Sequence, residues 1–172
     1  MNFKEVDFTE CLKETIAPLT EKGKGLLLTS VDAKGKPNTM AIGWGVVGSI
    51  WGLPMFCVLV RPSRYTYGLI EQTGDFTVNV PTEDMEEVVA FCGSASGRDV
   101  DKFIEMDLTA VHVPEIKSPI IRECPINFVC KVVHKNDVIP KELDPSINER
   151  AYKTGDYHRV YYGEILKTLR SK

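Results

Sequence analysis

Two arginines and two hydroxyl side chains gather within six residues in the segment Arg61-Pro62-Ser63-Arg64-Tyr65-Thr66. The spacing predicts that this segment joins a strand to a helix over Arg64 to Gln72, with Ser63 as its cap and Thr73-Gly74 as its end. A helix start offers free N–H groups and a positive dipole end, and arginine adds charge-assisted bonds to phosphate oxygens. The segment is therefore a candidate phosphate site. The alternative is a capped helix whose arginines meet surface carboxylates.

A second segment is rich in small residues and ends in a cation: Cys92-Gly93-Ser94-Ala95-Ser96-Gly97-Arg98-Asp99-Val100-Asp101-Lys102-Phe103. Small residues let backbone approach a ligand closely, and Lys102 supplies positive charge. Glycine and serine also make ordinary turns, so that interpretation stays open. The segment lacks the Walker spacing, and no G-x-G-x-x-G follows a strand, which argues against nucleotide binding by either device.

A third segment, Asn38-Thr39-Met40-Ala41-Ile42-Gly43-Trp44-Gly45, combines apolar side chains with glycines that expose backbone amides. A flat heteroaromatic ring needs such a wall, with apolar contact for its plane and N–H donors for its edge. An ordinary core strand that carries a tryptophan explains the same pattern.

The histidines and acids indicate little. His112, His134 and His158 lie more than twenty residues apart, and no metal site is predicted from their spacing. A G-x-S-x-G nucleophile elbow is missing, although Ser-His-Asp hydrolysis stays open. His158 precedes the last predicted strand, where it could reach a site or serve the structure.

Composition narrows the class of protein. The chain has 172 residues, 43% hydrophobic and 26% charged, and a formal charge of 21 − 24 = −3. These values exclude a disordered chain and a coiled coil, and they argue against a protein that binds nucleic acid or a membrane surface. No apolar run reaches the roughly 18 residues of a membrane span, and the acidic N-terminus is unlike a signal peptide, so a cytoplasmic protein is expected. Five scattered cysteines without a C-x-x-C pair suit that compartment.

The elements that must position these residues are mostly strands. Strands are predicted over residues 25–31, 38–46, 55–60, 75–80, 108–113, 126–134 and 159–169. Helices are predicted within 8–19, where Pro18 weakens the pattern, over 82–92 with Gly93 as the stop, and over 99–105. The pattern favours a mainly β (α+β) barrel with short helices, in a single domain over residues 1–172. Lys135 to Tyr157 is predicted to be a long surface excursion.

Taken together, the segments occur in an order that carries more information than any one of them. They read Asn38-x-Met40-x-Ile42-x-Trp44, then Val60-Arg61-Pro62-x-Arg64-x-Thr66 followed by Phe76-Thr77-Val78-Asn79-Val80-Pro81, and then Cys92-Gly93-x-x-Ser96-Gly97-x-x-x-Asp101-Lys102-Phe103. From about Gly25 to Leu169 the chain resembles the flavin reductase-like family with its FMN-binding split barrel, and within it the flavoredoxin branch. Tyr162-Gly163-Glu164-Ile165 also resembles the family's last strand, which usually follows a histidine, as His158 does here.

The resemblance implies a six-stranded antiparallel Greek-key split barrel and a homodimer with one FMN per subunit near the interface. By position, the 5′-phosphate would be held by Arg61, Ser63, Arg64, Thr66 and Lys102. The isoalloxazine and ribityl chain would be lined by Asn38, Thr39, Met40, Ala41, Ile42, Asn79, Ser96 and Gly97. His158 would orient the nicotinamide or bond the flavin edge, and the 135–157 excursion would cover the flavin or contact the partner subunit.

Three functions follow from these expectations. The first is an oxidoreductase that passes electrons from NAD(P)H through FMN to free flavin, a metal chelate or a protein, with the cofactor supplying the redox chemistry. The second is a flavoredoxin-like FMN electron carrier that exchanges electrons with a protein partner and has no NAD(P)H turnover of its own. The third is a barrel that has lost its ligand.

Overall fold

The computed structural model describes residues 2–21 and 24–172. Eight strands form one sheet in the order β3-β2-β6-β9-β10-β5-β4, with β1 beside β10, and every pair is antiparallel. The predicted mainly-β antiparallel split barrel is thereby confirmed. The strands are β1 (Phe3–Val6), β2 (Leu26–Val31), β3 (Pro37–Ile42), β4 (Gly45–Ile50), β5 (Leu53–Val60), β6 (Asp75–Val80), β9 (Ile126–Asp137) and β10 (Arg159–Ser171).

Two strands, β1 and β4, lie beyond the six of the predicted barrel. β4 arises because the strand predicted over 38–46 is broken at Gly43-Trp44, where β3 ends and the chain turns into a hairpin with β5. The strand predicted over 108–113 is wrong: only β7 (Ala110–Val111) forms, paired with β8 (Ile120–Ile121). Leu108 and Val113 are buried in two different hydrophobic clusters, so they anchor a loop rather than extend a strand.

β2 is buried on both faces, which accounts for its continuous apolar run. Leu26 and Leu28 point into the barrel core with Phe76 and Phe128, whereas Leu27 packs against the helices outside. β6 was predicted to be half-buried, but all six of its residues are buried. The loop over β7 and β8 covers its outer face, where the Thr77 hydroxyl donates to the Pro119 carbonyl at 2.7 Å.

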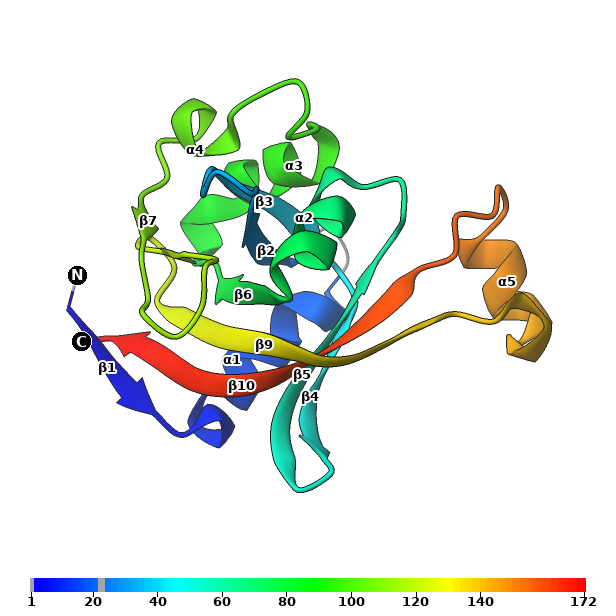
Figure 1. Ribbon diagram of the computed structural model, residues 1–172, viewed down its shortest axis with the longest axis horizontal. Helices are drawn as coiled ribbons and strands as arrows, with labels where there is room; N and C mark the ends of the chain where they lie inside the picture. Colours follow the sequence, from blue (N-terminus) through cyan, green and yellow to red (C-terminus); the bar gives the residue numbers. More distant parts are fainter. Residues whose placement is uncertain (1, 22–23) are drawn as a thin grey trace.

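The helices are short and lie around the barrel (Figure 1). α2, α3 and α4 gather over β2 and β3, and α1 lies on another side of the barrel. The predicted binding segments over 38–45 and 92–103 lie in the region of α3, α4 and β3. They are η1 (Phe8–Cys11), α1 (Leu12–Thr20), α2 (Tyr65–Thr73), η2 (Glu83–Met85), α3 (Glu86–Ser94), α4 (Lys102–Glu105), η3 (Pro140–Glu142) and α5 (Pro145–Ala151). In the described residues, no helix is long and apolar enough to cross a membrane.

Three details of the helix ends test the sequence predictions. The left-handed Gly74 ends α2 as predicted, with φ of 69°. Ser63 does not cap that helix, because Arg64 occupies the N-cap position. Gly93 was predicted to stop α3 but lies inside it, and the helix ends one residue later at Ser94.

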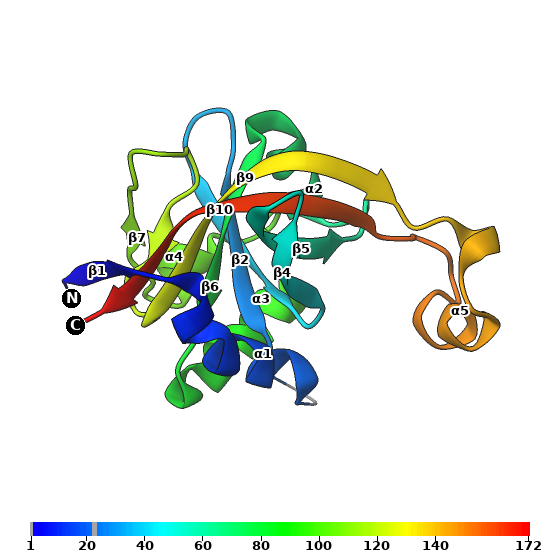
Figure 2. The same cartoon turned by 90° about the horizontal axis from the view of Figure 1, so that it is seen from below.

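β9 and β10 extend beyond the barrel as a two-stranded arm that carries α5 (Figures 1 and 2). Both views show α5 standing apart from the barrel, at the opposite end of the molecule from the two termini. The predicted excursion over 135–157 is therefore partly strand, because β9 continues to Asp137. Ile139 and Ile147 on this arm are 53% and 38% exposed.

The crossing of β10 over the barrel requires a glycine at position 163. A Cβ there would overlap the Phe76 ring and lie 2.9 Å from the Cβ of Cys130, both fully buried. We expect Gly163→Ala to lower the free energy of unfolding by about 1–3 kcal/mol, the usual cost of overpacking a core. Urea denaturation measures the change. Gly48→Ala, which meets nothing within 4 Å, is the matched control, and an equal loss in both variants would contradict the packing argument.

Candidate functional site

Two adjoining cavities, each of about 220 Å³, lie where the three predicted binding segments meet. They share Met40 and Arg64. The first, here called the cationic cavity, is lined by Asn38, Met40, Ser63, Arg64, Tyr65, Thr66, the 92–98 segment and Lys102. The second, the aromatic cavity, is lined by Met40, Ala41, Ile42, Gly43, Trp44, Leu59, Arg61, Arg64 and His158.

Lys102 is a buried cation at the wall of the cationic cavity. Asp101 caps α4 through the N–H groups of Phe103 and Ile104, and this places Lys102 in the first turn. Its side chain is 4% exposed, and its ammonium donates to the Cys92 carbonyl at 2.8 Å. Burial lowers the pKa of Lys102, and the nearby positive charge of Arg64 lowers it further. With no carboxylate paired to it among the described residues, the ammonium favours an anion in the cavity.

Arg64 and Thr66 face the same cavity from the start of α2. The Arg64 guanidinium has no hydrogen bond or ion pair with the residues that the structure describes, and it lines both cavities. The Thr66 hydroxyl accepts from Asn38 Nδ2 at 2.9 Å, so its own proton is free to point to a ligand. These two groups are therefore available to an anion.

The loop of Ser96 and Gly97 closes the other wall and lies against β3. A Cβ on Gly97 would overlap Asn38 Oδ1 and lie 2.7 Å from Tyr65 Cδ1. Only glycine allows this close approach, which brings the 92–103 segment against Asn38 and against Tyr65 of the 61–66 segment.

His158 lies in the aromatic cavity between two aromatic rings. Its ring is 5.0 Å from that of Trp44, and its Nδ1 is 2.8 Å from the Tyr152 hydroxyl. The side chain is 8% exposed. Burial, with a smaller contribution from the charge of Arg61, lowers the pKa of His158 to about 4. The imidazole is therefore neutral near pH 7.

Arg61 and Ser63 were predicted to bind the phosphate, and in the structure both bond the arm. The Arg61 guanidinium donates to three carbonyls at the end of the arm, those of Ala151 (2.7 Å), Gly155 (3.3 Å) and Asp156 (2.9 Å). The Ser63 hydroxyl donates to the Asp156 carboxylate at 2.6 Å. Both residues therefore connect the arm to the 61–66 segment. Arg61 lines the aromatic cavity and not the cationic one.

Thr39 and Asn79 were predicted to line the cofactor, and the structure places both outside the two cavities. Each is fully buried. The Asn79 amide donates to the Leu27 carbonyl at 2.9 Å and accepts from the Ile121 N–H at 3.0 Å. Because side chains alternate along a strand, Thr39 and Asn79 point to the opposite face from Met40 and Val78. There their polar groups bond β2 and the loop that carries Ile121.

Several residues of the site were missed by the sequence prediction. Arg98 lines the cationic cavity, and Trp44 lines the aromatic one. Tyr152 and Asp156 reach the site from the arm. Trp44 and Arg98 lie inside the 38–45 and 92–103 segments that the sequence analysis singled out. Tyr152 and Asp156 lie in the 135–157 excursion, and no local sequence pattern indicates where that excursion runs.

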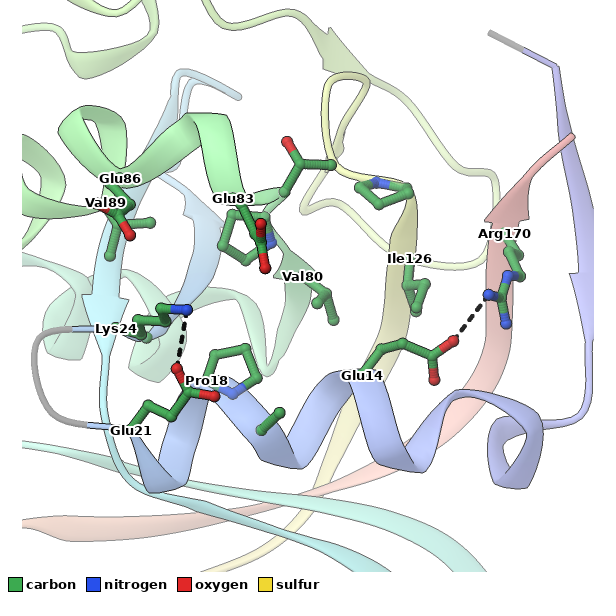
Figure 3. A pocket seen from close by; sticks show the side chains of 15 residues that line it. Glu14, Pro18, Glu21, Lys24, Val80, Glu83, Glu86, Val89, Ile126 and Arg170 are labelled. Carbon is green, nitrogen blue, oxygen red and sulfur yellow. Dashed lines mark hydrogen bonds and ion pairs between the residues drawn. The ribbon is translucent and has the colours of Figure 1, made fainter.

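A third cavity of about 400 Å³ lies away from these residues, among α1, the start of β9, and the ends of β6 and β10 (Figure 3). Its floor is apolar, with Pro18, Val80, Val89 and Ile126. Its rim carries four glutamates, and its two cations, Lys24 and Arg170, are already paired with Glu21 and Glu14 at 2.8 Å each. Such a rim disfavours an anionic ligand, so this cavity is a poor phosphate site.

Comparison with known proteins matches residues 23–171 to the family model of the flavin reductase like domain. A relative of unknown function from Archaeoglobus fulgidus is 36% identical over 131 residues, which are 76% of this chain and 64% of that protein. This chain spans less than two thirds of the length of the relatives that it matches.

Solved structures show the same fold. A flavoredoxin from Methanosarcina acetivorans is 30% identical, with a TM-score of 0.67 over 86% of this chain and 69% of that chain. An FMN-binding domain of a flavin reductases-like enzyme from Shewanella baltica has 20% identity and a TM-score of 0.67, over 98% and 77%. The NADH:FAD oxidoreductase SgcE6 of Streptomyces globisporus has 18% identity and a TM-score of 0.63, over 86% and 75%. The predicted resemblance is confirmed.

The neutral, buried state of His158 predicts a pH dependence of stability. Between the ordinary pKa of 6.5 and the folded value of about 4, the unfolded chain binds a proton that the folded chain does not. The free energy of unfolding therefore falls as pH decreases through this window, by on the order of 2–3 kcal/mol from this group.

Urea denaturation at pH 7 and at pH 4 measures the loss for the natural protein and for His158→Gln. We expect the variant to lose less stability on acidification by that amount. His112→Gln, at an exposed histidine, is the control and should lose as much as the natural protein. Equal losses in all three would show that His158 is not buried in its neutral form.

Proposed function

Because this chain belongs to the flavin reductase-like family, we propose that it is an FMN-binding oxidoreductase that passes electrons from NAD(P)H to an acceptor such as free flavin, a metal chelate or a protein. When bound, FMN supplies the redox chemistry, and the protein supplies binding, orientation and access. The Shewanella baltica protein is FMN-binding, which supports FMN, and SgcE6 is an NADH:FAD oxidoreductase, which supports a nicotinamide donor.

The buried ammonium of Lys102, unpaired with any described carboxylate, is the observation that carries the proposal. Together with Arg64 it leaves two positive charges facing one cavity. The 5′-phosphate of FMN would be held there by Lys102, Arg64 and Thr66, with the backbone of Ser96 and Gly97 close by. Charge-assisted bonds of this kind are roughly twice as strong as neutral ones.

The aromatic cavity is suited to the ring of a flavin. Met40 and Ile42 offer apolar contact, and the glycine at position 43 leaves the backbone accessible beside them. His158 stays uncharged and is fixed by Tyr152, so it can exchange a hydrogen bond with a ring edge without adding a charge. The aromatic cavity adjoins the cationic one at Met40 and Arg64, as one ligand that spans both requires.

A homodimer is part of the proposal. The arm exposes Ile139 and Ile147, and beside the aromatic cavity Trp44 and Val46 are 46% and 62% exposed. Apolar surface of this kind marks interaction sites. A second copy of the chain would cover it.

FMN binding by Lys102 and Arg64 is tested by equilibrium dialysis or fluorescence titration. We expect the natural protein to retain a flavin absorption band after desalting. Lys102→Met and Arg64→Ala should each weaken FMN binding by about 1.5–3 kcal/mol, the value of a hydrogen bond to a charged group. Lys117→Met, at an exposed lysine outside both cavities, is the control. Unchanged FMN affinity in both site variants would refute the phosphate site.

The likeness to flavoredoxins favours a second candidate, an FMN electron carrier that is reduced by a protein partner. Steady-state oxidation of NADH or NADPH in the presence of FMN separates the two functions. We expect turnover that falls in Lys102→Met together with FMN affinity. Bound FMN without turnover on either nicotinamide would instead establish the carrier.

A further inference from the structure

The ring of His158 is held at one nitrogen and free at the other. Nδ1 lies 2.8 Å from the Tyr152 hydroxyl. Nε2 has no hydrogen-bond partner in the described part of the chain, and it is not one of the enclosed polar atoms without a partner, which belong to Ser30, Asn127 and Thr168. Because His158 lines the aromatic cavity, the space open to Nε2 is that cavity. Nε2 is therefore the nitrogen that a ligand meets.

The hydroxyl of Tyr152 decides which nitrogen carries the imidazole proton. Tyr152 is 6% exposed, and burial raises the pKa of its hydroxyl, which therefore keeps its proton near pH 7. Among the described residues this hydroxyl has His158 Nδ1 as its single hydrogen-bond partner. If Nδ1 donated to the hydroxyl oxygen, the buried O–H would have no acceptor, which is costly. Donation from Tyr152 to Nδ1 avoids this cost and places the imidazole proton on Nε2.

Arg61 holds Tyr152 through both its backbone surroundings and its ring. The guanidinium donates to the carbonyls of Ala151, Gly155 and Asp156, which flank the tyrosine in the chain. Gly155 and Asp156 both have a left-handed conformation, with φ of 76° and 56°, and both of their carbonyls accept from Nη1. The guanidinium carbon also lies 5.1 Å from the centre of the Tyr152 ring, a cation–π distance. One planar fork thus fixes the chain on both sides of Tyr152.

The charge of Arg61 favours the same direction of the hydrogen bond. Its three acceptors are neutral carbonyls, so the positive charge beside the Tyr152 ring is not cancelled by them. This charge opposes the effect of burial on the pKa of Tyr152, which makes the hydroxyl a stronger donor. Burial lowers the pKa of His158, and the charge of Arg61 lowers it further, so the imidazole stays a neutral acceptor at Nδ1. The Asp156 carboxylate acts the other way on His158, but it is bonded by Ser63.

We propose that Arg61 and Tyr152 are positioning residues that hold His158 as a neutral donor, with its Nε2–H presented to the ring bound in the aromatic cavity. The inference rests on the proposed function, because it takes that ring to be the isoalloxazine of FMN. The edge of this ring carries carbonyl oxygens and nitrogens that accept hydrogen bonds. Electron density on these atoms rises on reduction, so a donor there binds the reduced ring more strongly than the oxidised one. The arm would therefore raise the reduction potential of bound FMN.

The position of the proton is measured in the flavin-free protein at pH 7 by ¹H–¹⁵N NMR of the histidine rings, with His158→Gln to assign the signals. We expect a protonated Nε2 and an unprotonated Nδ1. In Tyr152→Phe the two nitrogen signals should move toward each other, because nothing then fixes the proton on one nitrogen. Tyr157→Phe is the matched control and should resemble the natural protein, because its hydroxyl bonds Asn148 at 2.8 Å and not His158.

Arg61→Lys tests the guanidinium separately from its charge. Lysine keeps a cation but lacks the planar fork that bonds three carbonyls at once. We expect the two nitrogen signals of His158 to move toward each other in this variant as well, because Tyr152 is then held less firmly. Arg122→Lys changes an exposed arginine outside both cavities and should leave the signals unchanged. Signals in Arg61→Lys that match those in Arg122→Lys would overturn the part assigned to Arg61.

The reduction potential of bound FMN tests the consequence for the cofactor. We expect Tyr152→Phe to lower the ratio of the affinities for reduced and oxidised FMN by about three- to tenfold, the value of one hydrogen bond. For a two-electron couple this equals a fall of about 15–30 mV in a spectrophotometric redox titration. Tyr157→Phe should keep the natural potential. A purely structural role of Tyr152 would change the affinity for both forms alike and leave the potential where it is.

The outcomes separate the inference from the proposed function. If the natural protein binds no FMN, the proposed function fails, whereas the NMR spectrum of the flavin-free protein still decides how His158 is held. A proton on Nδ1 in the natural protein overturns the inference even where FMN binds, and so do equal potentials for Tyr152→Phe and Tyr157→Phe. Thermal unfolding shows whether each variant is folded, and Arg61→Lys supplies the comparison if Tyr152→Phe is not.

Discussion

The buried charge of Lys102 is the interaction on which the arrangement of the site depends. Removing an ammonium from water costs several kcal/mol unless other charges compensate, and the Cys92 carbonyl supplies one acceptor for its three donors. The position is set from both sides, since Asp101 caps the helix and Phe103 anchors it in the cluster that packs α3 on β2. The molecule therefore keeps an unfavourable charge in a fixed place. An anion between Lys102 and Arg64 would offset it, and binding of that anion would then stabilise the fold at this point.

Arg61 and Ser63 show that the 61–66 segment, besides lining the cavities, also holds the arm. They fasten the arm through the carbonyls of 151–156 and the carboxylate of Asp156. The Arg61 guanidinium bonds the arm, whereas that of Arg64, three residues later, lines both cavities. The same short segment thus sets the position of the arm relative to the ligand site. It also brings Tyr152 and His158 to the aromatic cavity, since both lie where the arm returns to the barrel.

Local patterns in the sequence were sufficient for much of the fold: β2, β5, β6, β9 and β10 follow from apolar runs and turn residues. The joint placement of Arg64, Thr66 and Lys102 was implied by the family resemblance and not by local pattern. Arg61, Thr39 and Asn79 show why residue type alone does not place a ligand contact: Arg61 bonds the arm, and Thr39 and Asn79 bond neighbouring strands and a loop. The direction of each side chain depends on neighbours distant in the chain. The break between β3 and β4, and the course of the arm, depend on such contacts too.

The two cavities differ in charge. The cationic cavity is lined by Lys102, Arg64 and Arg98. In the aromatic cavity the histidine is neutral, and the rest of the wall is apolar except for Arg61 and Arg64. The open side of that cavity continues past Gly43, Trp44 and Leu59 into an apolar hollow of about 420 Å³ between α1 and β4. In the proposed homodimer a second copy would cover Trp44 and Val46 at this hollow, so a nicotinamide or a protein partner would reach a bound flavin beside that interface. The proposed binding residues would be common to a reductase and a carrier, and the two proposals differ in which donor reduces the flavin.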